Sequence, residues 1–190
     1  MPSQNQSQRL ATEPVYIGFA GRIGAGKTSA ASHVASRYGF QYTRYSQVLE
    51  EWLPASAGDK DRLQQLGWDV MRRGLQVQLN SRLISGLNRS RSAAIDGLRH
   101  PIDFESLASA FGSAFRLVFL ESRRENRFHR LRSRFSTYAA FQTVDSQPVE
   151  AHVEDLRPLS SVTIANDGSL ESLCQPVDEW MARTGFGGQK

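Results

Sequence analysis

The octapeptide at positions 21–28 limits what this chain can fold into more than any other part of its sequence. It reads Gly-Arg-Ile-Gly-Ala-Gly-Lys-Thr and fits the pattern G-x-x-x-x-G-K-[ST] at every specified position. The apolar run Val15–Ala20 comes directly before it, and a helix-forming stretch follows. A strand, a glycine-rich turn and a helix in this order are typical of a phosphate-binding loop. That context disfavours the alternative, a glycine turn that binds nothing.

Each part of this octapeptide has an expected task. Its glycines let the backbone turn tightly, so that successive N–H groups point at phosphate oxygens while the following helix adds its positive end. Lys27 would reach the β- and γ-phosphates, and the Thr28 hydroxyl would ligate Mg²⁺. ATP and Mg²⁺ are therefore the expected ligands. The residues expected to hold them are Gly21, Gly24, Ala25, Gly26, Lys27, Thr28 and Ser29.

The chain has 190 residues, which suits one domain with a sizeable core. We expect the polar ends, residues 1–13 and 185–190, to be flexible tails around a domain at 14–184. The single cysteine, Cys174, excludes an internal disulfide framework. No stretch approaches the ~20 apolar residues of a membrane span, and the N-terminus has no apolar signal segment. These features predict a cytoplasmic protein with no membrane partner.

The formal net charge is +4, a modest excess of basic residues. Only three lysines occur, so arginine supplies nearly all of the positive charge. Arginine grips discrete phosphates with two parallel hydrogen bonds, although a compositional bias explains the same count. A nucleic-acid partner is not favoured, because the excess is small and aromatic residues do not interleave the basic face.

Apolar and helix-forming segments alternate along the chain. Apolar runs without strict two-residue alternation predict strands covered on both faces. These strands are expected at Val15–Ala20, Ala93–Asp96, Phe115–Leu120, Val162–Ala165 and, on a weaker pattern, Phe40–Tyr45. Helices are expected at Lys27–Tyr38, Gln47–Leu53, Lys60–Leu87, Asp103–Phe111, Arg123–Arg134 and Leu170–Arg183. The alternation predicts a three-layer α/β fold with a doubly wound, parallel five-stranded sheet that binds ligands at the carboxyl ends of its strands.

A further candidate residue ends one of these strands. Asp96 follows an apolar run, where a carboxylate would support Mg²⁺ directly or through water, and Arg99 follows closely enough to contact a phosphate. The alternative is an ordinary turn, because Asp-Gly is a common turn dipeptide. His100 stands beside a proline with no partner at a recognisable spacing, so no catalytic task is assigned to it.

Arginine is concentrated between positions 123 and 134. On a helix, Arg123, Arg127, Arg130 and Arg134 would share one face. Like charges so aligned repel one another, and an anion would relieve that repulsion. We expect a phosphate clamp in which Arg127 and Arg130 act catalytically and Arg134 binds the nucleotide. A solvated basic face is the alternative.

The stretch 61–73 is a candidate acceptor site. Trp68 is suited to stack on a base, and Arg62, Arg72 or Arg73 to hold a phosphate. An amphipathic core helix with surface arginines explains the same residues equally well.

The order of these parts resembles the nucleoside monophosphate kinase group of P-loop enzymes, in particular its dephospho-coenzyme A kinase and phage-type deoxynucleoside monophosphate kinase branch. The likeness is carried by Ile17–Thr28, Leu63–Gly67, Ile95–Arg99, the segment with Arg127, Arg130 and Arg134, and Ile164–Leu173. The last stretch is similar to the I-x-N-x-G-[ST]-L-E-x-L close of that group, which places Asn166 and Gly168 beside the nucleotide base. The resemblance implies a P-loop NTPase fold, a small helical lid at about 123–150, and phosphoryl transfer from ATP to a nucleotide acceptor.

The chain departs from that group after the second strand along the sequence. There the group offers an acidic residue followed closely by an arginine, whereas this chain has Gln47 and Glu50. The acceptor-binding residues are therefore not carried over, and the identity of the acceptor stays open. Two other functions also remain: a nucleotide-dependent switch or hydrolase with a protein or nucleic-acid partner, and a degenerate kinase that binds ATP without an acceptor. The oligomeric state is open between a monomer and a homodimer.

Overall fold

The computed structural model describes residues 13–52 and 59–186 of the chain. In this part of the chain the strands run parallel in one five-stranded sheet with the order β2-β3-β1-β4-β5. The strands are β1 (Tyr16–Ala20), β2 (Gln41–Arg44), β3 (Ala93–Leu98), β4 (Phe115–Glu121) and β5 (Val162–Ala165). The expected α/β fold with a parallel five-stranded sheet is confirmed. The tails expected at 1–13 and 185–190 lie almost wholly outside the described residues.

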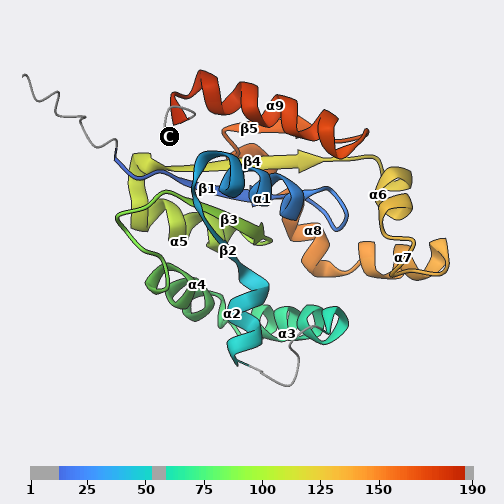
Figure 1. Ribbon diagram of the computed structural model, residues 1–190. Helices are drawn as coiled ribbons and strands as arrows, with labels where there is room; N and C mark the ends of the chain where they lie inside the picture. The colour runs from blue at the N-terminus through green and yellow to red at the C-terminus, as the bar shows by residue number, and fades with distance from the viewer. Residues whose placement is uncertain (1–12, 53–58, 187–190) are drawn as a thin grey trace, which may run out of the picture.

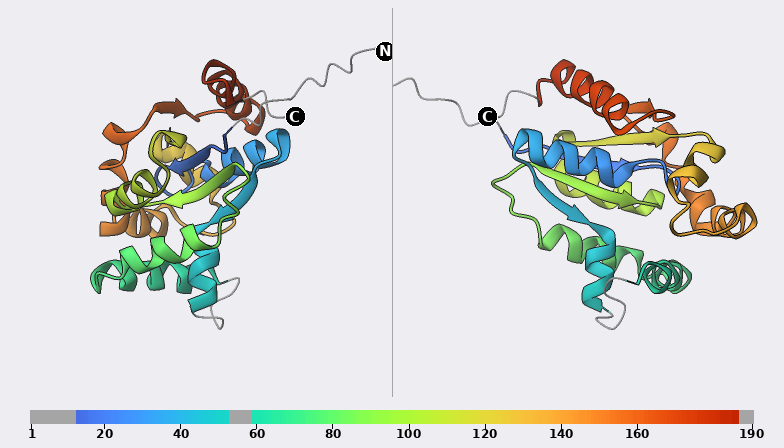
Figure 2. Two further views of the ribbon diagram at one scale, coloured as in Figure 1. Left: turned by 90° about the vertical axis from the view of Figure 1, so that its left-hand side faces the viewer. Right: turned by 45° about the vertical axis from the view of Figure 1, so that its right-hand side comes forward.

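Helices cover both faces of the sheet (Figure 1). One face carries α1 (Lys27–Tyr38) and α9 (Leu170–Arg183), which pack against each other. The other side carries α2 (Tyr45–Trp52), α3 (Lys60–Arg72), α4 (Gln76–Ser85), α5 (Pro101–Phe111) and α8 (Pro148–Glu154). Beyond the carboxyl ends of the strands lie α6 (Arg124–Arg130) and α7 (Tyr138–Asp145), and two 3₁₀ turns span Gly112–Ala114 and Arg157–Leu159 (Figure 2). Among the described helices, none is both long and apolar enough to cross a membrane.

The strands are apolar on both sides because each side faces a helical layer. In β1, Ile17 and Phe19 are fully buried in the core beneath α1 and α9. Tyr16 and Ala20 point the other way and pack in the core that α2, α4 and α5 cover. A parallel sheet covered in this way needs continuous rather than alternating apolar runs, which is the pattern that the sequence carries.

One long helix, expected over Lys60–Leu87, is in fact two. The chain breaks between α3 and α4 at Gly74, whose φ of +68° lies in the left-handed region. Residues with a Cβ rarely adopt that conformation, so a glycine here ends the first helix. The second helix, α4, then turns back to pack against α5.

The helix expected over Arg123–Arg134 was also placed wrongly. The structure has a shorter α6, Arg124–Arg130, followed by turns and by the additional helices α7 and α8. Local signals for the additional helices were present in the sequence. Thr137 caps α7 by accepting a hydrogen bond from the Ala140 N–H, and Pro148 stands in the first turn of α8.

Candidate active site

The candidate phosphate-binding loop (P-loop), residues 21–28, lies between β1 and α1 at the carboxyl edge of the sheet. Its glycines Gly21, Gly24 and Gly26 have φ angles of +141°, +77° and +105°. A Cβ at Gly21 would stand 2.3 Å from the Leu120 carbonyl oxygen, and one at Gly26 would stand 2.3 Å from Asn166 Nδ2. Both the backbone conformation and the space therefore require glycine at Gly21 and Gly26, and the loop leads directly into the N-terminus of α1.

Lys27 is buried at the base of this loop. Its Nζ donates hydrogen bonds to the carbonyl oxygens of Gly21 (2.6 Å) and Arg22 (3.1 Å). Burial, helped by the positive charge of Arg99, lowers the pKa of the Lys27 ammonium to about 8. A bound phosphate would favour the charged form, because an opposite charge nearby offsets the cost of burial.

Thr28 and Asp96 form the candidate magnesium site. The Thr28 hydroxyl donates a hydrogen bond to Asp96 Oδ2 at 2.7 Å, and the Tyr42 hydroxyl donates to the same oxygen at 3.0 Å. The described residues contain no cluster of three or more His, Cys, Asp or Glu side chains that could hold a metal by themselves. One hydroxyl and one carboxylate fit Mg²⁺, which usually takes one or two protein ligands together with phosphate oxygens and water.

A cavity of about 500 Å³ opens from this loop toward α2, α3 and α4. One wall consists of loop residues and their neighbours, including Gly24, Lys27, Thr28, Asp96 and Arg99. The opposite wall is contributed by the helical side and includes Arg44, Glu50, Leu63, Gln76 and Leu79. The candidate phosphate site and a second, partly apolar compartment are therefore continuous.

The second compartment has a polar end held by Asp103. This carboxylate is 1% exposed and accepts hydrogen bonds from the backbone N–H groups of Arg99 (2.9 Å) and His100 (3.0 Å). The side-chain amides of Gln76 and Asn80 donate to its other oxygen. Burial raises the pKa of Asp103 despite these bonds. His100 caps α5 and takes no part in lining the cavity.

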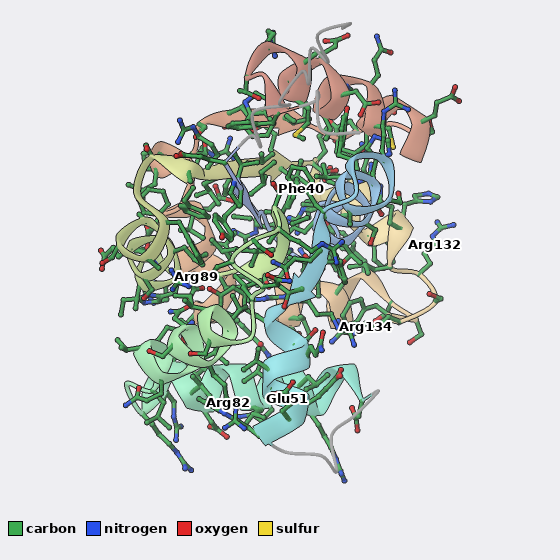
Figure 3. The ribbon with its side chains drawn as sticks, turned by 60° about the vertical axis from the view of Figure 1, so that its left-hand side comes forward. Phe40, Glu51, Arg82, Arg89, Arg132 and Arg134 are labelled. Carbon is green, nitrogen blue, oxygen red and sulfur yellow. The ribbon has the colours of Figure 1, made fainter. Side chains whose placement is uncertain are left out.

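A salt bridge also lines this compartment. Arg44, the last residue of β2, pairs with Glu50 of α2 at 3.3 Å, and both line the cavity. A second ion pair at 3.8 Å, between Glu51 and Arg82, ties α2 to α4 (Figure 3). Trp68, for which stacking on a base was one of two interpretations, does not line the cavity; α3 instead contributes Leu63, Gly67 and Met71.

Arg127 does not stand free on a basic face. Its side chain is buried and donates to both oxygens of Asp145, at 2.5 and 3.1 Å, and to the Ile23 carbonyl oxygen at 3.1 Å. Arg22 and Arg124 bind the same carboxylate from two other sides. Burial by itself raises the pKa of Asp145, but the hydrogen bonds and charges of Arg127 and Arg22 outweigh burial and hold the pKa below its usual value.

Arg130 contacts the candidate P-loop and the turn that follows β5. Its guanidinium donates to the backbone oxygens of Gly24 (3.2 Å), Asn166 (2.7 Å) and Gly168 (3.1 Å). Asn166 in turn donates to the Ala25 carbonyl oxygen at 2.8 Å. The turn between β5 and α9, expected beside the nucleotide, is thus joined to the loop through one arginine and one amide.

The remaining arginines of the expected stripe do not share a face. Arg123 pairs with Asp167 at 3.3 Å, whereas Arg134 follows the end of α6 and lines the cavity. In Figure 3 the Arg132 side chain projects away from the ribbon, and Arg134 lies toward α2. The single helical stripe was therefore wrong, because α6 ends at Arg130 and the chain turns before reaching Arg134.

Sequence reasoning missed a buried carboxylate, Glu150 of α8. It accepts a hydrogen bond from the Ile23 N–H at 2.7 Å and pairs with the Arg99 guanidinium. Burial raises the pKa of Glu150, but the charges of Arg99 and Lys27 outweigh burial and lower it. Glu150 thereby joins α8, the loop and Arg99. Pro148 indicated a helix start near it, but no local pattern shows which residue a carboxylate 51 positions after Arg99 will contact.

Together these features define the class of the fold. A parallel sheet of this order, with a glycine-rich loop between β1 and α1 and a Thr–Asp pair at its mouth, is the P-loop NTPase fold. Comparison with protein-family models finds no match, and comparison with curated protein sequences finds none either.

Solved structures share the architecture over nearly the whole chain. A gluconokinase from Sinorhizobium meliloti 1021 is 17% identical with a TM-score of 0.59, and the match covers 90% of this chain and 93% of that chain. A shikimate kinase from Acinetobacter baumannii is 19% identical with a TM-score of 0.55, covering 92% and 96%. TT1252 from Thermus thermophilus is 18% identical with a TM-score of 0.58, covering 90% and 98%. Identities this low establish a shared fold only.

Proposed function

We propose that this protein is an ATP-dependent phosphotransferase that acts on a small molecule. One observation carries the proposal: Lys27, Thr28 and Asp96, which are suited to hold Mg²⁺ and phosphates, line the same cavity as a compartment large enough for a second substrate. A kinase needs both sites side by side so that the transferred group moves directly between them.

The residues of the chain would divide the work between binding and charge stabilisation. The P-loop N–H groups and Lys27 bind the phosphates of ATP, while Thr28 and Asp96 hold Mg²⁺, which neutralises charge on those phosphates. Arg99 and Arg134, which line the cavity, are placed to meet charge that develops on the transferred group. Arg127 acts at a distance, because its hydrogen bond to the Ile23 carbonyl positions the loop.

The finer proposal concerns the acceptor and the lid. The sequence resemblance favours a nucleotide or nucleotide-like acceptor, of the nucleoside monophosphate or dephospho-coenzyme A type, and a lid at about 123–150. The similar folds include a gluconokinase and a shikimate kinase, so a hydroxylated acid is the competing acceptor.

The test is a transfer assay with Mg²⁺-ATP and a panel of nucleoside monophosphates, deoxynucleoside monophosphates, dephospho-coenzyme A, gluconate and shikimate. ADP and the phosphorylated acceptor are measured together, with Lys27→Met as the inactive control. The proposal predicts that at least one acceptor stimulates ADP formation with an equal amount of phosphorylated product. ADP released at the same rate without any acceptor would instead support a hydrolase or switch, and no ADP in any mixture would contradict catalysis.

A further inference from the structure

The side-chain carbonyl oxygen of Gln76 is an unsatisfied hydrogen-bond acceptor among the described residues. Gln76 begins α4, is only 6% exposed and lines the cavity. Among the described residues, no group donates a hydrogen bond to its Oε1. A buried polar atom without a partner is rare, because losing its hydrogen bonds to water costs free energy. Such an atom at the wall of a cavity indicates a ligand that completes it.

Asp103, which lies beside the Gln76 amide, sets the orientation of that amide. Asp103 accepts two hydrogen bonds at each carboxylate oxygen, and Gln76 Nε2 supplies one of these at 2.5 Å. The backbone N–H groups of Arg99 and His100 can only donate, and they stabilise the ionised form of Asp103, which has no proton to give to Gln76. The amide therefore turns its N–H toward Asp103, which leaves its carbonyl oxygen without a donor among the described residues.

A neighbouring amide provides a contrast. Asn80, one turn further along α4, also donates to Asp103, at 3.0 Å. Its own carbonyl oxygen is satisfied by the Tyr45 hydroxyl, and Asn80 does not line the cavity. Both amides support the same carboxylate, but of the two only Gln76 combines a place in the cavity wall with an unsatisfied oxygen.

The cavity that Gln76 lines carries both apolar and charged side chains. Leu49, Leu63 and Leu79 are apolar, Arg44 is paired with Glu50, and Arg134 brings positive charge. Beside Gln76 an anionic group of the ligand would be repelled, because an amide oxygen and the Asp103 carboxylate lie close together there. The guanidinium of Arg134 favours such a group.

We propose that Gln76 determines acceptor specificity: its carbonyl oxygen accepts a hydrogen bond from a neutral hydroxyl or N–H group of the phosphoryl acceptor. The acceptor is then a small molecule with an apolar body, a neutral donor beside Gln76 and any anionic group near Arg134. This inference rests on the proposed kinase function and deepens it.

The test compares Gln76→Met with the matched control Asn80→Met, using the best acceptor found in the panel. Both variants and the wild type are also assayed with analogues of that acceptor, in each of which one hydroxyl or amino group is replaced by hydrogen. We expect Gln76→Met to lower kcat/KM for the acceptor about tenfold or more and to leave KM for ATP unchanged. Asn80→Met changes the acceptor KM much less, and one deoxy or deamino analogue is used equally well by wild type and Gln76→Met.

The outcomes separate the two levels of the proposal. Turnover with none of the panel overturns the kinase function and this inference with it. Turnover with an unchanged kcat/KM for the acceptor in Gln76→Met, or the same loss in Asn80→Met, overturns only the inference and assigns Gln76 a structural task. Should Gln76→Met fail to fold, Gln76→Ala serves in its place. Asp103 keeps its other three hydrogen-bond donors in that variant. The comparison of acceptor analogues then still reports the loss of the hydrogen bond between Gln76 and the acceptor.

Discussion

At the scale of single residues, Lys27 shows how function opposes stability. Its ammonium group is buried and depends on the carbonyl oxygens of Gly21 and Arg22 for hydrogen bonds. The pKa of about 8, against an ordinary value of 10.5, means that the folded state disfavours the charged form. At neutral pH this charge costs stability, and the cost disappears as the pH rises from about 8 toward 10.5.

We therefore expect Lys27→Met to be inactive and yet more stable than wild type. Loss of the ammonium group lowers kcat/KM by about 10²-fold or more, since it removes charge stabilisation at the transferred phosphoryl group. The uncharged side chain no longer bears the cost of burial, so the free energy of unfolding at pH 7 rises by about 1 kcal/mol or more. Urea denaturation measures this change. Lys27→Arg, which keeps the charge, should show no such gain, and a less stable Lys27→Met would contradict the explanation.

At the scale of secondary-structure elements, the junction of α3 and α4 decides the shape of the cavity. Residues 60–87 have the composition of one helix, but the left-handed glycine at position 74 divides them. Because the chain turns there, α3 places Leu63 and Gly67 on the cavity while α4 places Gln76 and Leu79 on it. One continuous helix would separate these residues along its axis.

Two glycine substitutions in this region should have opposite effects on stability. Gly74→Ala meets no atom within 4 Å but forces a Cβ into the left-handed region, which costs about 1–2 kcal/mol. Gly67→Ala lies inside α3, has only Leu49 Cδ1 near it at 3.7 Å, and should gain up to about 1 kcal/mol from helix propensity. Thermal unfolding of the two variants provides the measurement. A stabilising Gly74→Ala would show that this break does not depend on glycine.

At the scale of the whole molecule, buried carboxylates join the carboxyl-edge helices to the P-loop. Asp145 of α7 gathers Arg22, Arg124 and Arg127, and Glu150 of α8 holds the Ile23 N–H. The apolar side of Ile23 packs with Phe135 and Phe141. The α6–α8 region is therefore attached to the loop by both charge and packing.

Removing the Asp145 charge should destabilise the fold strongly. In Asp145→Asn the buried Arg127 loses its counter-charge, which costs about 3–5 kcal/mol of unfolding free energy. Asp178→Asn is the control, because Asp178 holds a more exposed cluster with His33 and Tyr38 between α1 and α9 and should cost less. Urea titrations at pH 7 compare the two. Equal losses would contradict a special role for the Asp145 network.

The same network predicts sensitivity to acid. The pKa values of Asp145 and Glu150 are lower in the folded protein than their usual values. Their stabilisation is thus fully present above about pH 4–5, where unfolded carboxylates are ionised, and is lost as the pH falls through the folded pKa values. Asp145→Asn should flatten this acid dependence in part, and an unchanged pH profile would exclude Asp145 as one of its sources.

Sequence alone determined the architecture and the phosphate loop, because both depend on local patterns. Apolar runs located all five strands, and the octapeptide at 21–28 located the loop and its buried Lys27. The same local reasoning predicted a stripe of arginines that does not form. A helical face was inferred from spacing, and spacing does not reveal that α6 ends at Arg130.

Tertiary structure alone decided which groups the buried polar side chains contact. Arg127 was expected to clamp phosphate, and the structure places its guanidinium on Asp145, 18 positions away, and on the Ile23 carbonyl oxygen of the loop. Gln76 and Asp103 gave no signal in the sequence, since a hydrogen bond between residues 27 positions apart leaves no periodic pattern. Burial, partner geometry and an unsatisfied oxygen are properties of the packed chain, whereas strand patterns and a glycine-rich loop are already present in the order of residues.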